Sequence, residues 1–223
     1  MTRGRFITFE GGEGSGKSTQ VASLVKRLTT LGLDVTATRE PGGSPGAEAV
    51  RHVLLSGAAK PLGAYAEALL FAAARNDHVT QTIRPALEEG KWVVSDRFAD
   101  STRVYQGSLS NVDARLIARL EQLTVGETRP DLTIVLDLPA EVGLERAARR
   151  RGNGAGDRFE AEALEFHKKL REAYLELAAR EANRCAVIDA TPAPDVVADA
   201  VWAVVNARLH PAEAPLAIEN VAS

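Results

Sequence analysis

Cysteine is nearly absent from this chain of 223 residues, which contains only Cys185. A single cysteine cannot form an intramolecular disulfide, and it excludes a cysteine-rich metal site. The four histidines are scattered and lack the spacing of a zinc site. With 45% hydrophobic residues, the chain can instead bury a sizeable apolar core.

Long apolar runs are also missing from the sequence. No stretch approaches the roughly 18–20 apolar residues of a membrane-spanning helix. Met1 to Arg5 lead directly into a strand-like run, with no apolar signal region. We therefore expect a cytoplasmic protein with no membrane partner. The formal net charge of −3 argues against a nucleic-acid partner, although local arginines can still bind phosphate groups.

Apolar runs alternate with amphipathic segments along the chain. This pattern predicts strands over residues 5–9, 33–38, 92–95, 132–136 and 186–188. It predicts helices over 17–31, 48–55, 64–89, 159–179 and 195–209, the third broken near residues 76–77 or at Pro85. Such alternation is typical of a parallel sheet covered on both faces. We expect one domain over residues 1–210 and a poorly ordered tail over 211–223.

Residues 11–18, GGEGSGKS, fit the phosphate-binding pattern G-x-x-x-x-G-K-[ST] between a strand and a helix. Glycines let backbone N–H groups surround phosphate oxygens, and the helix N-terminus adds partial positive charge. Lys17 would neutralise the β- and γ-phosphates, and Ser18 would ligate Mg²⁺. The motif predicts a P-loop NTPase-type three-layer sandwich with a parallel five-stranded sheet. The expected ATP-binding residues are Gly12, Glu13, Gly14, Ser15, Gly16, Lys17, Ser18 and Thr19.

Asp96 directly follows the apolar run over residues 92–95, which places it at the carboxyl edge of the predicted sheet. Ligands of open α/β sheets bind at this edge. We expect Asp96 to hold Mg²⁺ together with Ser18. The alternatives are a helix cap or an ion pair with Arg97.

The arginines outside the phosphate loop favour a small kinase over other P-loop proteins. Transfer between two bound anions needs extra positive charge. A GTPase would carry N-K-x-D and D-x-x-G motifs, and neither occurs in a suitable place. A kinase for another acceptor and a regulatory nucleotide switch stay open as alternatives.

Several further motifs occur in a fixed order along the chain. They are FEGGEGSGKST from Phe9, REPGG from Arg39, LFAAAR from Leu70, DRFADST from Asp96, YQG from Tyr105 and RPDLT from Arg129. Together they resemble the bacterial thymidylate kinases, from about Phe6 to Leu209. The resemblance implies a homodimer that uses Mg-ATP as phosphate donor and dTMP as acceptor.

The resemblance also implies an acceptor site. Arg97 would grip the dTMP phosphate, Phe71 would stack on thymine, and Arg75, one helical turn later, would bond a pyrimidine carbonyl. Without the resemblance, Phe71 would be read as core packing. The resemblance further implies that Thr102 and Gln106 contact the base and that Tyr105 excludes a 2′-hydroxyl. It implies that Glu13 contacts the 3′-hydroxyl and that Glu40 and Arg51 contact the acceptor. Without the resemblance, Glu13, Glu40 and Arg51 would be interpreted as solvated surface groups.

The phosphate loop contains no arginine, so additional transition-state charge must come from elsewhere. Arg149, Arg150 and Arg151 precede the glycine-rich residues 152–156. We predict a mobile basic lid over about residues 149–158, with Arg158 as a further candidate. The expected catalytic set is thus Lys17, Glu13, Arg97 and the three consecutive arginines, unless the latter form only a solvated charge run.

Overall fold

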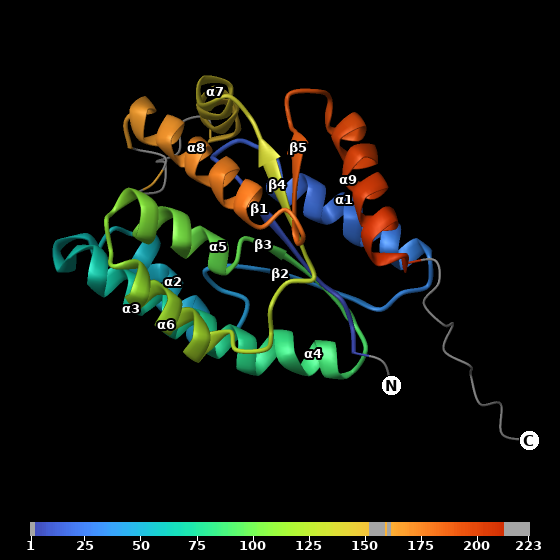
Figure 1. Ribbon diagram of the computed structural model, residues 1–223, viewed down its shortest axis with the longest axis horizontal. Coiled ribbons are helices and arrows are strands. Elements are labelled where there is room, and N and C mark those ends of the chain that lie inside the picture. The colour runs from blue at the N-terminus through green and yellow to red at the C-terminus, as the bar shows by residue number, and fades with distance from the viewer. Residues whose placement is uncertain (1–2, 152–158, 160–161, 212–223) are drawn as a thin grey trace, which may run out of the picture.

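The computed structural model describes residues 3–151, 159 and 162–211. Five strands form one parallel sheet in the order β2-β3-β1-β4-β5, as Figure 1 shows. The strands are β1 (Phe6–Glu10), β2 (Val35–Arg39), β3 (Trp92–Asp96), β4 (Leu132–Asp137) and β5 (Cys185–Asp189). The predicted fold class is therefore confirmed.

Helices cover both faces of the sheet because neighbouring strand residues point to opposite sides. Ile7 and Phe9 pack against α1 (Lys17–Thr30) and α9 (Pro194–Leu209). Phe6, which precedes Ile7 and points to the opposite face, packs there with Phe98 and the segment before α4 (Arg84–Glu88). On the side of β4 and β5, this second face is covered by α8 (Leu164–Arg180), which packs on Val135 and Cys185.

The helix predicted over residues 64–89 is a succession of three helical segments. They are α3 (Gly63–His78), the π-type turn η2 (Val79–Ile83) and α4. The irregular turn lies between the two predicted break points, immediately before the proline-containing start of α4. Pro85 has no backbone N–H, so the regular hydrogen-bond ladder cannot continue through it.

The helix predicted over residues 159–179 begins later, at Leu164. Phe159 instead lies in a turn, where its ring meets Tyr105 edge-on at 5.1 Å between ring centres. The apolar spacing that included Phe159 was therefore interpreted wrongly as helical. This aromatic residue belongs to the wall of a cavity.

Four helical segments between Ala99 and Arg151 were not predicted from the sequence pattern. They are α5 (Ala99–Thr102) with its π-type continuation η3 (Arg103–Leu109), α6 (Ala114–Thr124) and α7 (Ala140–Arg151). Arg149–Arg151 therefore end a helix rather than forming a loop. The glycine-rich residues 152–156 and Arg158 lie outside the described residues, as does the tail from residue 212.

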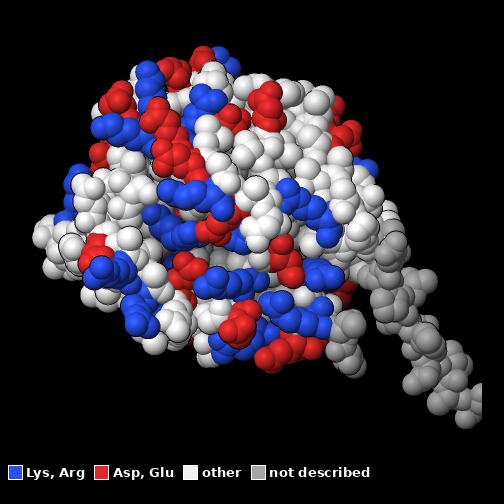
Figure 2. Space-filling model, viewed as in Figure 1, with Lys and Arg blue, Asp and Glu red and all other residues white. Residues whose placement is uncertain are grey.

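The remaining helices are α2 (Pro45–Leu55) and the short 3₁₀ turn η1 (Lys60–Leu62). Figure 1 places α2, α3 and α6 together, on the side of the sheet away from α9. On the face drawn in Figure 2, basic and acidic side chains are interspersed, with no broad area of one sign. This face therefore offers no broad basic surface for the expected phosphate ligands, so the charges that bind them must lie within a cleft.

Candidate functional site

The carboxyl ends of β1, β2 and β3 meet at one edge of the sheet. Phe9 pairs with Asp96 across the β1–β3 boundary, and Arg39 pairs with Asp96 across β2–β3. The segments that follow these strands therefore converge, although they are far apart in sequence. They surround a pocket of about 470 Å³, at the edge where α/β proteins bind ligands.

The phosphate loop connects β1 to α1 with the conformation that its glycines allow. Gly14 has φ +67°, and a Cβ there would lie 2.0 Å from the Gly143 carbonyl oxygen. Lys17 Nζ donates to the carbonyls of Gly12 at 2.8 Å and Gly11 at 3.1 Å. Burial, reinforced by the charge of Arg97, lowers the pKa of Lys17 to about 8.

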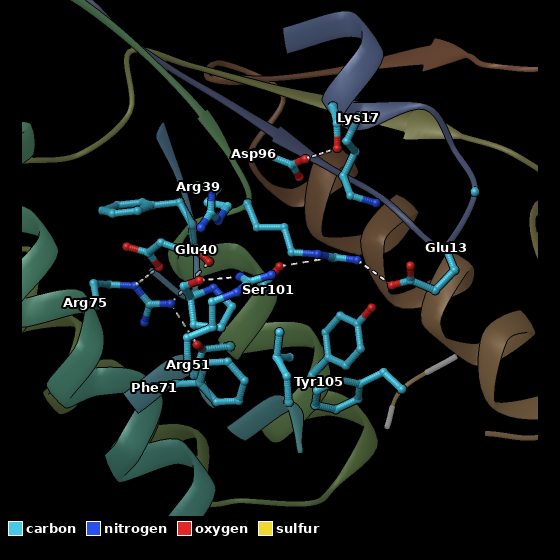
Figure 3. A pocket seen from close by; sticks show the side chains of 18 of the residues that line it. Glu13, Lys17, Arg39, Glu40, Arg51, Phe71, Arg75, Asp96, Ser101 and Tyr105 are labelled. Atoms are coloured by element: carbon cyan, nitrogen blue, oxygen red, sulfur yellow. Dashed lines mark hydrogen bonds and ion pairs between the residues drawn. The ribbon is translucent and has the colours of Figure 1, made fainter. Parts of the chain in front are cut away.

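Ser18 and Asp96 both line the pocket, and Figure 3 shows Asp96 beside Lys17. Ser18 Oγ donates to Asp96 Oδ2 at 2.6 Å. A hydroxyl and a carboxylate are oxygen donors of the kind that Mg²⁺ prefers. Among the described residues, the Asp96 carboxylate bonds the Ser18 hydroxyl; it neither pairs with Arg97 nor accepts from a backbone N–H at the start of a helix.

Arg97 crosses the pocket from β3 towards the phosphate loop. Its Nη2 donates to Glu13 Oε1 at 2.8 Å, and its Nη1 donates to the Gly11 carbonyl at 3.2 Å and to Tyr174 Oη at 3.1 Å. Burial opposes ionisation of Glu13, but the charges of Arg97 and Lys17 outweigh it and lower its pKa. Glu13 is therefore a partly buried carboxylate of the site rather than a solvated surface group.

Glu10 is a central residue that the sequence reasoning missed. Its carboxylate accepts from the backbone N–H of Phe98 at 2.8 Å, from the hydroxyl of Ser101 at 2.7 Å and from that of Tyr174 at 2.9 Å. Burial raises its pKa to about 7, while the charge of Arg97 opposes that rise. Glu10 thus caps α5 from β1, which explains why no local capping signal marks this helix in the sequence.

The opposite wall of the pocket carries most of the predicted acceptor residues. Arg75 Nε donates to Glu40 Oε2 at 2.8 Å, and its Nη2 donates to Thr102 Oγ1 at 3.0 Å. Phe71 is half-buried in this wall and belongs to none of the apolar core clusters among the described residues. Arg51 donates to the Pro41 carbonyl beside it. Figure 3 shows Phe71, Arg75 and Glu40 across the pocket from Glu13 and Lys17.

Most expected site residues line this one pocket. They are Glu13, Gly14, Gly16, Lys17, Ser18, Thr19, Glu40, Arg51, Phe71, Arg75, Asp96, Arg97, Thr102, Tyr105, Gln106 and Arg150. Gly12 and Ser15 do not line it themselves, although Ser15 Oγ donates to the Gly12 carbonyl at 2.9 Å within the loop. Ser101, Pro41 and Phe159 line it without having been predicted; Ser101 lay within the DRFADST motif, whereas Phe159 gave no signal beyond its aromatic side chain.

The consecutive arginines Arg149 and Arg150 at the end of α7 lie in different environments. Burial raises the pKa of Glu13, and Arg150, which lines the pocket, adds its charge to those of Arg97 and Lys17 in lowering it. Arg149 points elsewhere and binds Glu145 at 2.5 Å on the exposed surface. The side chain of Arg151 lies outside the description. Of the two described arginines, only Arg150 is therefore placed to act in the site.

A glycine-rich loop at a helix N-terminus, a strand-end aspartate and a second set of arginines share one pocket. With the parallel sheet, these features define a P-loop nucleotide kinase. The family model for thymidylate kinase matches residues 9–201. The chain therefore belongs to the thymidylate kinase family, whose members are ATP-dependent phosphotransferases.

Individual relatives agree with this assignment. The thymidylate kinase of Nitrobacter winogradskyi is 61% identical, with 95% of this chain and 92% of the relative covered. That of Bradyrhizobium diazoefficiens is 59% identical, with 95% and 93% covered. The crystal structure of thymidylate kinase from Ehrlichia chaffeensis has a TM-score of 0.72 at 32% identity, with 91% of this chain and 99% of that chain covered. Within the described part of this chain, every helix is too short or too polar to cross a membrane.

Proposed function

We propose that this pocket transfers the γ-phosphate of ATP to dTMP and releases dTDP and ADP, a step of dTTP biosynthesis. The observation that carries the proposal is the presence of two cationic sets in one cleft. Lys17 and the phosphate loop lie on the donor side, and Arg97, Arg75 and Arg51 lie towards the acceptor side. Family membership supplies the choice of dTMP among possible acceptors.

The chemistry requires positive charge more than a base. A dTMP phosphate oxygen is already ionised near neutral pH, so it can attack the γ-phosphorus directly. As that bond forms, the bond to the bridging β–γ oxygen breaks and ADP leaves. Lys17, Arg97 and Arg150 would stabilise the charge spread over the transferring group. We propose that Arg150 belongs to a lid that closes over it.

Acceptor recognition follows from the wall opposite the phosphate loop. Phe71 would stack on thymine, and Arg75 would bond a pyrimidine carbonyl, with Thr102 and Gln106 at the base edge. The ring of Tyr105 would fill the space beside the sugar 2′ carbon, and Glu13 would accept from the 3′-hydroxyl. Arg97 would bind the acceptor phosphate, and Glu40 and Arg51 would support that wall.

Magnesium is the cation that this site is built to hold. Ser18 and Asp96 already share a hydrogen bond at the end of the phosphate loop, and both offer oxygen ligands. When bound, Mg²⁺ would neutralise charge on the nucleotide phosphates. We propose the cytoplasm as the site of action, where nucleotide pools supply both substrates.

We also propose a homodimer that forms through α3 and α6. Leu62, Tyr65 and Leu69 expose 65%, 53% and 53% of their surface, and Leu123 of α6 exposes 78%. Tyr65 and Leu69 are four residues apart on α3, so they share one helix face, and Leu62 lies in the turn η1 just before that helix. Large exposed apolar side chains gathered on one face support an interface between subunits.

The proposed reaction is tested by a coupled ADP-release assay with each nucleoside monophosphate in turn, with and without Mg²⁺. We expect Mg²⁺-dependent ADP release that requires dTMP and is largely lost in the Lys17→Ala variant. Stronger turnover with another monophosphate would change the proposed acceptor. Slow ATP hydrolysis that no monophosphate stimulates would support a nucleotide switch instead.

A further inference from the structure

A continuous row of polar side chains, all buried except the half-buried Thr38, runs behind the acceptor wall. Thr38 at the end of β2 contacts His78 of α3, with 2.6 Å between Oγ1 and Nε2. His78 Nδ1 lies 3.0 Å from Glu40 Oε1, and the other oxygen of Glu40 accepts from Arg75 at 2.8 Å. Arg75 in turn donates to Thr102 of α5 at 3.0 Å. Three separate segments are thus linked through one carboxylate.

His78 cannot touch a ligand directly. Its side chain is fully buried, and it is not among the residues that line the pocket. The turn after β2 is shaped around its ring, because a Cβ on Gly43 would lie 2.4 Å from His78 Nε2 and 2.4 Å from Thr38 Oγ1. Gly43 also has φ +86°, so a side chain is disfavoured there for two reasons.

The bonding pattern assigns a direction to each hydrogen bond. An ionised carboxylate only accepts, so the bond to Glu40 requires a proton on His78 Nδ1. In the neutral ring, Nε2 then accepts from the Thr38 hydroxyl. Because a threonine hydroxyl can donate or accept, Thr38 is compatible with the tautomer that donates to Glu40. Glu40, with 7% of its surface exposed, has both oxygens engaged and cannot rotate freely.

We propose that His78 is a positioning residue for acceptor recognition, which acts through Glu40 to fix the guanidinium of Arg75. This inference rests on the proposed function, because it assigns the readout to the pyrimidine base of dTMP. Nε and Nη2 of Arg75 are held by Glu40, Thr102 and the Phe98 carbonyl. Its Nη1 makes no hydrogen bond within the described part of the chain and is the group left for the base.

Loss of the bond from His78 leaves one oxygen of a buried carboxylate without its donor. A buried acceptor without a partner is costly, so Glu40 would turn to recover a second bond. Its strongest available donor is Arg75, which would be drawn into a two-pronged pair and away from the pocket. The base contact would weaken, whereas the phosphate loop on the other side would be unaffected.

Two amide substitutions of His78 each keep one of its two hydrogen bonds, the bond to Glu40 or the bond to Thr38. In His78→Asn, the amide nitrogen lies as many bonds from the backbone as Nδ1, so it can still donate to Glu40. In His78→Gln, the amide nitrogen corresponds to Nε2, so it can reach Thr38 but not Glu40. His78→Phe keeps the ring volume and removes both bonds. The proposal is tested by the dTMP dissociation constant, kcat, the KM for ATP and the melting temperature of each variant.

We expect the dissociation constant for dTMP to rise at least tenfold in His78→Gln and His78→Phe, and less than threefold in His78→Asn. The kcat and the KM for ATP should stay within about twofold of wild type, since the donor side is untouched. Equal losses in the Asn and Gln variants, or lower melting temperatures with unchanged dTMP affinity, would overturn the proposal. The Asn and Gln pair decides the matter even when the Phe variant fails to fold.

A double-mutant cycle with Arg75→Ala tests whether His78 affects dTMP binding through Arg75 or by another route. When His78 acts through Arg75, His78→Gln should not weaken dTMP binding further in the Arg75→Ala background. Additive losses of dTMP binding free energy would show that His78 does not act through Arg75, which would overturn the proposal. Failure of the proposed function gives a different result: the wild-type protein would not bind dTMP, and the same cycle would then be measured with the monophosphate that it phosphorylates.

Discussion

Single side chains carry the electrostatics of this site, and Lys17 is the clearest case. Its pKa is lowered to about 8, first by burial and then by the charge of Arg97. Nucleotide phosphates bring opposite charge next to the ammonium group and should raise this pKa again. Above pH 8, binding therefore has to add a proton to Lys17.

We predict that ADP binding at pH 8.5 is coupled to proton uptake and that ADP affinity falls as pH rises through about 8. Titration calorimetry in buffers of different ionisation enthalpy measures the uptake directly. In Lys17→Met, affinity should be lower and the uptake at pH 8.5 should disappear. Wild-type binding without proton uptake at that pH would contradict the assigned pKa.

Tyr105 offers a second test, because its ring and its hydroxyl have separable roles. The ring packs edge-on against Phe159, whereas the buried hydroxyl has no hydrogen-bond partner among the described residues. We predict that Tyr105→Phe retains turnover of dTMP. Tyr105→Ala should lower the ratio of kcat/KM for dTMP over its ribonucleotide analogue, because the space beside the 2′ carbon opens. A ratio unchanged in the alanine variant would remove Tyr105 from sugar discrimination.

Residues whose place in the pocket follows from local sequence could be predicted, and residues held there by distant contacts could not. The phosphate loop and Asp96 have chemistry that follows from spacing and from the end of a strand. Glu10 and His78 were missed because their partners lie far away in the sequence. Glu10 bonds Tyr174, 164 residues later, and His78 bonds Glu40, 38 residues earlier. Neither pairing leaves a periodic signal.

At the scale of elements, apolar runs identified all five strands, whereas helix limits depended on tertiary contacts. Helix α6 is capped by Asp113, whose side chain accepts from the Arg115 N–H at 2.7 Å, and this capping signal was available in the sequence. Helix α5 has no such signal because Glu10 of β1 caps it. The end of α7 was interpreted as a loop because its arginines and the following glycines suggested one.

The end of α7 allows a matched comparison of neighbouring arginines. We predict that Arg150→Ala lowers kcat at least about tenfold, a loss of roughly 1.4 kcal/mol of transition-state stabilisation. Arg149→Ala should stay close to wild type, because Arg149 is 75% exposed and pairs only with Glu145 at the surface among the described residues. Steady-state kinetics with both variants measures the difference.

The dTMP dissociation constant of the same variants shows on which side Arg150 acts. A donor-side lid residue should leave that constant nearly unchanged. A large loss of dTMP affinity with normal kcat would place Arg150 at the acceptor site. Equal effects of the two substitutions would show that the basic run acts only through its general charge.

At the scale of the whole molecule, the two faces of the sheet differ in what they leave exposed. The face bearing α3 and α6 carries four large exposed apolar side chains, at Leu62, Tyr65, Leu69 and Leu123. On the other face, Val196 of α9 and Leu31 at the end of α1 are exposed. The acceptor residues Phe71 and Arg75 lie on α3 itself, so an interface built on this helix would also hold the acceptor wall in place.

We predict that the protein is a dimer at micromolar concentration and that Leu69→Glu shifts it towards the monomer. A buried glutamate at such an interface would lack a partner, which is strongly unfavourable. The matched control is Val196→Glu, since Leu69 and Val196 are exposed to nearly the same extent, 53% and 54%. Sedimentation equilibrium should show weakened association only for Leu69→Glu. Because α3 carries acceptor residues, the monomeric variant should also bind dTMP more weakly while its affinity for ADP is retained. A monomeric wild-type protein, or equal dissociation in both variants, would place the interface elsewhere and leave the exposed face of α3 without this role.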